Sequence, residues 1–209
     1  MDHVMDFSEC LERLVETARS KQLSVWAGAG ISWKTPACRP LARELKLYIL
    51  ESICSHPALS GFFKNRLQQD SNIYDMIASY PLEAFIEQIE RHLNIVSDIA
   101  KVFRGGSPNK YHLFIAKMMK ERFVREVLTT NFDLLIERAL ESNGWHAGVN
   151  YRVYSTESRF ARLGSARCVP SVFKIHGTAD NEKSMRITLS QVASRGLSES
   201  RAIALRLRS

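Results

Sequence analysis

Three short segments of the sequence combine residue types that could bind a phosphate- and sugar-containing ligand. They are residues 28–32 (Gly-Ala-Gly-Ile-Ser), 129–133 (Thr-Thr-Asn-Phe-Asp) and 174–177 (Lys-Ile-His-Gly). Each one ends a run of apolar residues of the length of a buried strand. In an open parallel sheet, ligand-binding groups gather outside the carboxyl ends of the strands. Their common position therefore predicts one shared site.

The first segment has the composition of a phosphate-binding turn. Gly28 and Gly30 stand one residue apart, which lets the backbone turn tightly and approach a pyrophosphate. A helix that begins beyond them would offer free N–H groups to the anion. The third glycine of the G-x-G-x-x-G fingerprint is absent, because Trp33 occupies its position. A plain strand-to-helix turn is the alternative.

The second segment offers hydrogen-bonding groups for a sugar and an amide. Asn131 can both donate to and accept from a sugar hydroxyl, and Asp133 can accept from an amide or a hydroxyl. The alternative is helix capping, with Asn131 or Thr130 as N-cap and Asp133 in the first turn.

The third segment supplies a candidate base. His176 can act as a base near neutral pH, and Gly177 allows a ligand or another backbone to come close. A structural histidine is the alternative. The other five histidines are assigned structural positions: His3, His56, His92, His112 and His146.

Apolar periodicity predicts the elements that must position these segments. Helices are expected over residues 7–19, 40–55, 110–120 and 134–141, with a mostly helical stretch over 72–103. Strands are expected over 23–27, 123–130, 151–154 and 170–175, with residues 185–189 as a strand or a turn and 196–209 weakly amphipathic. Strands separated by helices favour an α/β fold with a mainly parallel sheet.

Composition narrows the class of protein. With 209 residues, 45% of them hydrophobic and 24% charged, the chain is an ordinary globular domain without a membrane-length apolar run or a secretory signal. We expect a cytoplasmic protein. The net charge of +7 is spread thinly, so nucleic acid is expected only as an indirect partner. The cysteines at 10, 38, 54 and 168 form no C-x-x-C pair, which argues against zinc.

Three segments resemble, in the same order along the chain, the three signature blocks of the sirtuins: residues 28–32, 129–133 and His176-Gly177. The form Thr-Thr-Asn-Phe-Asp-Leu-Leu-Ile-Glu and the run Lys-Ile-His-Gly are most similar to the zinc-free sirtuin-like domains of bacterial antiphage defence proteins. The resemblance covers roughly residues 10–190. It implies a Rossmann-like, NAD-binding sheet flanked by helices, with a helical insertion at about residues 56–105.

The resemblance also implies roles for individual residues. Asn131 would hold the nicotinamide ribose and orient a water, and His176 would act as general base. Asp133 would bind the nicotinamide carboxamide. The NAD-binding set comprises Gly28, Ala29, Gly30, Ser32, Thr130 and Asp133, and Arg39 matches an arginine of a further sirtuin segment. NAD would be a substrate, and no metal ligand is expected.

The sequence also departs from the deacylating sirtuins. Their four-cysteine zinc module is missing after His176-Gly177, and 45 residues separate Asn131 from His176. No Gly-x-Ser turn for the adenosine ribose follows, so either residues 1–209 are a C-terminally incomplete single domain or the far half of the NAD site is missing.

The leading hypothesis is an NAD glycohydrolase that releases nicotinamide and ADP-ribose. The alternatives are an NAD-dependent deacylase or ADP-ribosyltransferase, and a non-catalytic regulatory or nucleic-acid-associated module. Besides NAD, a homo-oligomer or a larger polypeptide with a sensor domain is expected, and no membrane.

Overall fold

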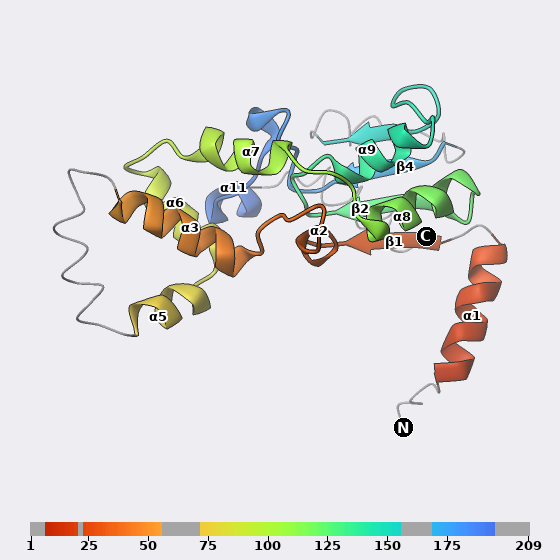
Figure 1. Ribbon diagram of the computed structural model, residues 1–209, viewed down its shortest axis with the longest axis horizontal. Coiled ribbons are helices and arrows are strands. Elements are labelled where there is room, and N and C mark those ends of the chain that lie inside the picture. Colours follow the sequence, from red (N-terminus) through yellow and green to blue (C-terminus); the bar gives the residue numbers. More distant parts are fainter. Residues whose placement is uncertain (1–6, 21–22, 56–71, 156–168, 195–209) are drawn as a thin grey trace.

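The computed structural model describes residues 7–20, 23–55, 72–155 and 169–194. They form a parallel sheet with helices packed on it, and a separate group of helices beyond the carboxyl ends of the strands (Figure 1). The predicted amphipathic stretch 196–209 and Cys168 lie outside the described residues.

Four parallel strands make the sheet, in the order β1-β2-β4-β3. They are β1 (Leu23–Ala27), β2 (Val124–Thr129), β3 (Arg152–Tyr154) and β4 (Ser171–Lys174). All three pairings are parallel, which confirms the predicted Rossmann-like α/β fold. The observed strands lie within the predicted ranges and are up to two residues shorter than them.

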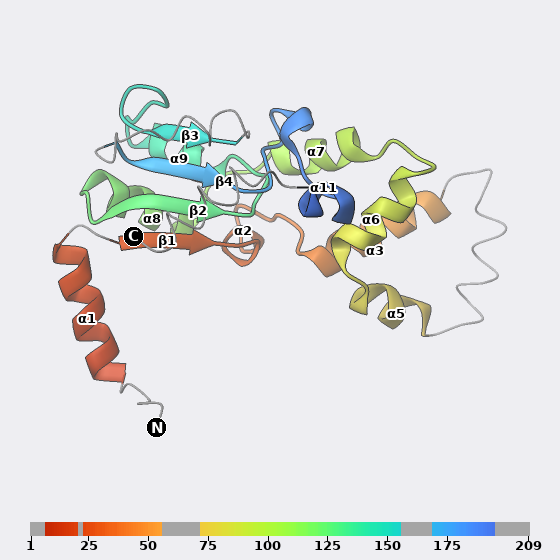
Figure 2. The ribbon, with the colours of Figure 1, turned by 180° about the vertical axis from the view of Figure 1, so that it is seen from behind.

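Two helices cover one face of the sheet. Helices α8 (Lys110–Lys120) and α9 (Leu135–Ser142) lie side by side, in front of the strands in Figure 1 and behind them in Figure 2. Their buried residues Ala116, Met119 and Ala139 pack against Val127 and Val172 of the sheet. The opposite face carries a smaller apolar cluster, Leu128, Phe173 and Ile175.

Five described helices beyond the carboxyl ends of the strands form what we call the helical lobe. It consists of α3 (Ala42–Cys54), α5 (Ile73–Ser79), α6 (Leu82–Glu90), α7 (Val96–Arg104) and α11 (Leu189–Ala193). Its core includes Leu45, Ile49, Ile86, Ile99 and Phe103. Helices α5, α6 and α7 lie within the predicted helical insertion at about 56–105. Helix α3, which precedes the insertion, shares a core with α6 and α7, and α11, which follows it, packs against α6 without a buried residue of its own. Residues 56–71 lie outside the described residues.

Residues 185–189, expected as a strand or a turn, form no strand. They run from the 3-10 helix η1 (Glu182–Ser184) into α11, and Met185 and Ile187 are buried in the core of the helical lobe. Their apolar pattern reflects packing against α-helices rather than a place in the sheet.

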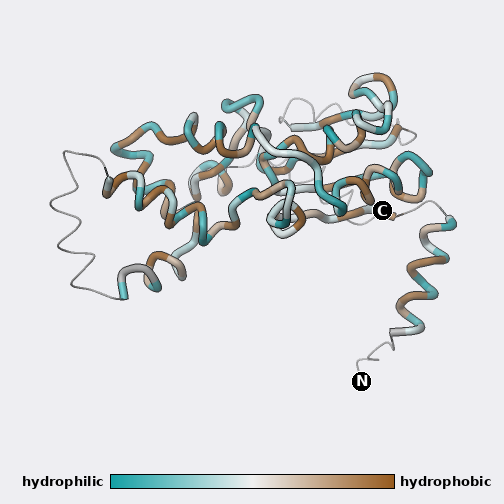
Figure 3. Tube along the Cα trace, in the orientation of Figure 1, coloured by the Kyte–Doolittle hydropathy of each residue, from teal (hydrophilic) through white to brown (hydrophobic). Residues whose placement is uncertain are grey.

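Helix α1 (Phe7–Arg19) was predicted with the same bounds. Hydrophobic residues recur along it (Figure 3). Leu11 and Leu14 are nevertheless each about half exposed. None of the helices in the described ranges is long and apolar enough to cross a membrane.

Candidate functional site

The register of the sheet brings the three predicted segments to one edge. Ala27 of β1 pairs with Thr129 of β2, and Thr129 pairs with Lys174 of β4. The chain leaves all three strands directly after this row, toward the helical lobe. A cavity of about 340 Å³ lies between the strand ends and the helical lobe.

Residues of all three segments line this cavity, which we call the strand-end cavity. From the segments come Ala29, Ser32, Thr130, Asn131, Phe132, Asp133 and His176. Gly28 and Gly30, also predicted to bind NAD, are not among the lining residues. The helical lobe contributes mainly apolar side chains, among them Leu45, Ile86 and Phe103, while Arg39, Glu83 and Arg186 add charge. The cavity thus has a polar floor and a largely apolar wall.

The first turn runs through Gly28 and Ala29 into the short helix α2 (Gly30–Trp33). The N–H groups of Ile31 and Ser32 donate to the carbonyls of Gly28 and Ala29, at 3.2 and 3.0 Å. Within the described part of the chain, the N–H groups of Ala29 and Gly30 have no hydrogen-bond partner. A Cβ on Gly30 would have no neighbour within 4 Å. This turn therefore has two free N–H donors and open space beside Gly30.

Asn131 ties the first two segments together. Its side-chain Nδ2 donates to the Gly28 carbonyl and to the Ser32 hydroxyl, both at 3.1 Å. Its backbone N–H donates to Thr129 Oγ1 at 3.0 Å. Neither Asn131 nor Thr130 is the N-cap of α9, so that alternative is wrong. Asn131 lines the strand-end cavity.

Asp133 lies at the start of α9 and also lines the strand-end cavity. Its Oδ1 accepts from the backbone N–H of Leu135 at 3.1 Å, which satisfies a donor in the first turn of α9. The same buried residue lines the strand-end cavity. Its backbone carbonyl accepts from Nζ of Lys174, whose ammonium also pairs with Glu137 Oε1 at 3.1 Å. Burial raises the pKa of Glu137, although the Lys174 charge opposes this shift.

His176 is half-buried on the turn after β4. Its ring lies beside that of Phe132, with centroids 6.4 Å apart. The following Gly177 has a φ of +85°, and a Cβ there would lie 2.0 Å from the Ser184 carbonyl oxygen. The predicted close approach at Gly177 is thus to backbone rather than to a ligand. It lets residues 182–186 fold back under His176, whose carbonyl accepts from Arg186 N–H at 2.9 Å.

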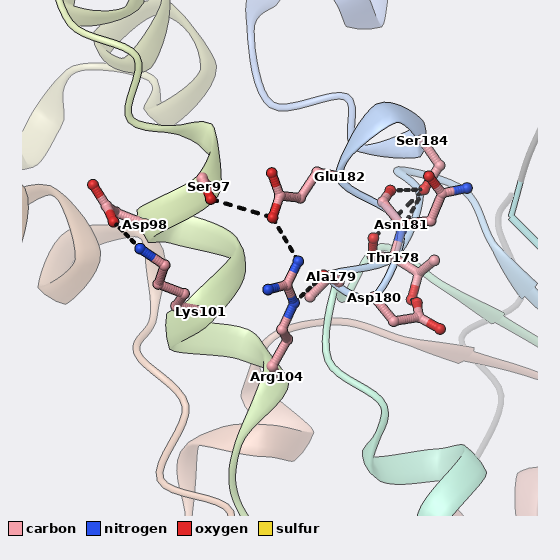
Figure 4. A network of polar contacts seen from close by, with 10 residues as sticks. All are labelled: Ser97, Asp98, Lys101, Arg104, Thr178, Ala179, Asp180, Asn181, Glu182 and Ser184. Carbon is pink, nitrogen blue, oxygen red and sulfur yellow. Dashed lines mark hydrogen bonds and ion pairs between the residues drawn. The ribbon is translucent and has the colours of Figure 1, made fainter.

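Polar contacts fasten this returning segment to α7 (Figure 4). The Arg104 guanidinium pairs with Glu182 at 2.5 Å and donates from Nε to the Ala179 carbonyl at 2.8 Å. Ser97 also donates to Glu182, at 3.3 Å. The segment that carries His176 is therefore held against the helical lobe.

Two residues at the start of α8 contact the turn after β1, although neither lines the strand-end cavity. Asn109 caps α8, and its side-chain Nδ2 donates to the carbonyls of Ile31 and Lys34, at 2.7 and 3.1 Å. Nε2 of the His112 ring lies 3.0 Å from the hydroxyl oxygen of Ser32. The capping-box spacing of Asn109 and His112 was the available signal.

Arg39, matched by resemblance to a sirtuin arginine, lines the strand-end cavity. Its guanidinium is largely engaged by backbone, because Nε donates to the Ala37 carbonyl at 2.7 Å and Nη1 donates to the Val102 carbonyl. Arg39 therefore joins the loop after α2 to α7.

Metal ligands are sparse in the described ranges. No group of three or more His, Cys, Asp or Glu side chains there could hold a metal ion. Cys10, Cys38 and Cys54 are free thiols, and Cys168 is not described. The absence of zinc stays a prediction.

Comparison with known families finds one match. Residues 125–208 match the family model of the SIR2-like domain. The matched range contains Asn131, Asp133 and His176, and it begins after residues 28–32. Such a domain implies an NAD-related, sirtuin-like activity in general terms. No curated protein matches the chain.

Proposed function

We propose that this protein is an NAD glycohydrolase, which releases nicotinamide and ADP-ribose, and that it acts in the cytoplasm as an effector domain of a bacterial antiphage defence system. The observation that carries the activity is the meeting of the three segments at one cavity. The defence role rests on the resemblance of residues 129–137 and 174–177 described above.

The arrangement of polar groups suits a dinucleotide. Ala29 and Gly30 offer two N–H donors for a phosphate beside the Ser32 hydroxyl. Asn131 would contact the nicotinamide ribose, and Asp133 would accept from the carboxamide. The volume of about 340 Å³ lies within the usual range of small-molecule sites.

Hydrolysis needs positioning and a base rather than a strong nucleophile. The bond from ribose C1′ to the pyridinium nitrogen breaks, and its electron pair leaves with nicotinamide, which becomes neutral. A water oxygen bonds to C1′, and His176 accepts the proton that this water loses. Fixed dipoles around the ribose, such as the amide of Asn131, stabilise the positive charge that develops there.

The decisive experiment incubates the purified chain with NAD and measures free nicotinamide and ADP-ribose, with and without an acetyl-lysine peptide. Peptide-independent release of both products is expected. Release that requires the peptide, with transfer of the acetyl group, would replace the proposal by the deacylase alternative. ADP-ribose attached to protein would favour the transferase. NAD binding without any product would favour a regulatory module.

Control of the activity is a further part of the proposal. An NAD-consuming effector would be held in check by assembly into a homo-oligomer or by a sensor domain in a larger polypeptide. Size-exclusion chromatography with light scattering, with and without NAD, tests the oligomer.

A further inference from the structure

The hydrogen bonds around His112 define where its proton sits. The backbone N–H of Asn109 lies 3.1 Å from Nδ1 of His112. A backbone N–H can only donate, so Nδ1 must be the unprotonated, accepting nitrogen. In a neutral ring the proton is then on Nε2, which faces the Ser32 hydroxyl at 3.0 Å. Burial favours this neutral form, because it lowers the pKa of His112 against the opposing charge of Asp133.

The same reasoning orients the Ser32 hydroxyl. Its oxygen accepts from His112 Nε2 and from Asn131 Nδ2, whose amide is oriented by its second bond to the Gly28 carbonyl. A hydroxyl oxygen has two lone pairs, and both are now used. The hydroxyl proton must therefore point elsewhere, and Ser32 lines the strand-end cavity.

We propose that His112 is a positioning residue, which fixes the Ser32 hydroxyl as a hydrogen-bond donor to an acceptor oxygen of the dinucleotide in the strand-end cavity. The ligand part of this inference rests on the proposed function. His112 itself need not touch the ligand. It acts through Ser32, across 80 positions of sequence.

Two substitutions of His112 separate this role from a structural one. Glutamine and glutamate both keep the oxygen that accepts the Asn109 N–H, as in other capping boxes. The other terminal atom of the side chain then faces Ser32. In His112→Gln it is an amide nitrogen that still donates an N–H to Ser32. In His112→Glu it is an oxygen that can only accept, and it draws the Ser32 proton away from the cavity. Isothermal titration with ADP-ribose should give a Kd within about threefold of wild type for His112→Gln and at least about tenfold weaker for His112→Glu.

A double-mutant cycle removes the effect of the added charge. In the Ser32→Ala background, His112→Gln and His112→Glu should bind ADP-ribose within about threefold of one another, because no hydroxyl remains to be turned. A full tenfold difference that persists without the hydroxyl would show direct charge repulsion and overturn the proposal. Equal affinities of the two variants with Ser32 present would overturn it as well.

The tautomer can be checked without substitution or ligand. Nitrogen-15 NMR of the histidine rings in the wild-type chain should show His112 neutral and protonated on Nε2 at neutral pH. Protonation on Nδ1, or an imidazolium, would overturn the proposal. If the wild type binds ADP-ribose but releases no nicotinamide, the proposed hydrolysis fails alone, whereas a lack of any ADP-ribose binding overturns both.

Discussion

The side-chain amide of Asn131 donates to the hydroxyl of Ser32 over 3.1 Å, although 99 positions separate the two residues along the chain. Together with the bond to the Gly28 carbonyl, it joins the turns after β1 and β2 into one surface. A substitution at Asn131 therefore disturbs both the alignment of the cavity floor and the proposed contact to the ribose.

We predict that Asn131→Ala loses nicotinamide release by at least about a hundredfold, because a dipole at the reacting ribose is lost. It should also lower the melting temperature by several degrees, since two buried hydrogen bonds disappear, each worth about 1 kcal/mol. Thermal melts and nicotinamide release from the same preparation measure both effects.

Asn143→Ala is the matched control. The Asn143 amide donates to the Ala139 carbonyl at 2.8 Å at the end of α9, and the residue does not line the strand-end cavity. This variant should lose stability but keep normal turnover. An Asn131→Ala protein that hydrolyses NAD normally would assign Asn131 a purely structural role.

His176→Ala should reduce nicotinamide release by about 10²–10⁴-fold, the usual contribution of a general base. His176 is half-buried and lies on a turn, so the melting temperature should stay within a few degrees of wild type. ADP-ribose should still bind, which calorimetry can check. Near-normal turnover would show that another group, or water alone, takes the proton.

Gly177→Ala should be strongly destabilising. The alanine would need a φ of +85° and would place Cβ 2.0 Å from the Ser184 carbonyl oxygen. The left-handed backbone alone costs about 1–2 kcal/mol, and the clash adds to it. Denaturant titration measures the free energy of unfolding.

Gly30→Ala provides the contrast, since a Cβ there meets nothing within 4 Å. Its free energy of unfolding should match or slightly exceed that of wild type, because alanine restricts the unfolded chain. Weakened NAD binding with intact stability would support a ligand that approaches the Gly30 backbone. An equally large loss of stability at both glycines would contradict the structure of the two turns.

The free energy of unfolding should decrease at acidic pH because His112 becomes protonated. Burial lowers the folded-state pKa of this ring below its ordinary value of about 6.5, so the unfolded chain binds the proton first. The contribution of His112 is therefore full above that pH and is lost as the pH falls through the folded-state pKa. Urea titrations at about pH 7.5 and about pH 5.5 should show a larger loss for wild type than for His112→Gln. The same acid loss in both proteins would assign the effect to other groups.

Zinc should be absent from the purified protein. The cysteine spacing offers no ligand pair, so elemental analysis should find far less than one zinc per chain, and EDTA should leave the melting temperature unchanged. About one zinc per chain would contradict this and reopen the deacylase alternative.

Sequence patterns predicted the sheet well, because each strand is a compact apolar run ended by a polar or glycine-containing turn. The meeting of Ser32, Asn131 and His176 followed from the common edge of a parallel sheet. The contact of His112 with Ser32 was not predicted, for a physical reason. Its capping-box spacing to Asn109 is local and visible, but its contact with Ser32 exists only after α8 packs against β2 and α2. The place of α3 in the helical lobe likewise depends on packing, which helical periodicity alone does not specify.

Ala27, Thr129 and Lys174 pair in one row across the three strands. The site therefore depends on the number of residues in each of these strands. One extra residue in β2 would push Asn131 about 3.3 Å along the strand and exchange the two faces for every side chain after it. The turn at Gly144 follows α9 and does not line the cavity, and a Cβ on Gly144 would meet nothing within 4 Å. We expect the same insertion there to leave the cavity unchanged. Length changes are thus forbidden in three short strands and permitted at such turns, which predicts where insertions and deletions occur among natural variants of this domain.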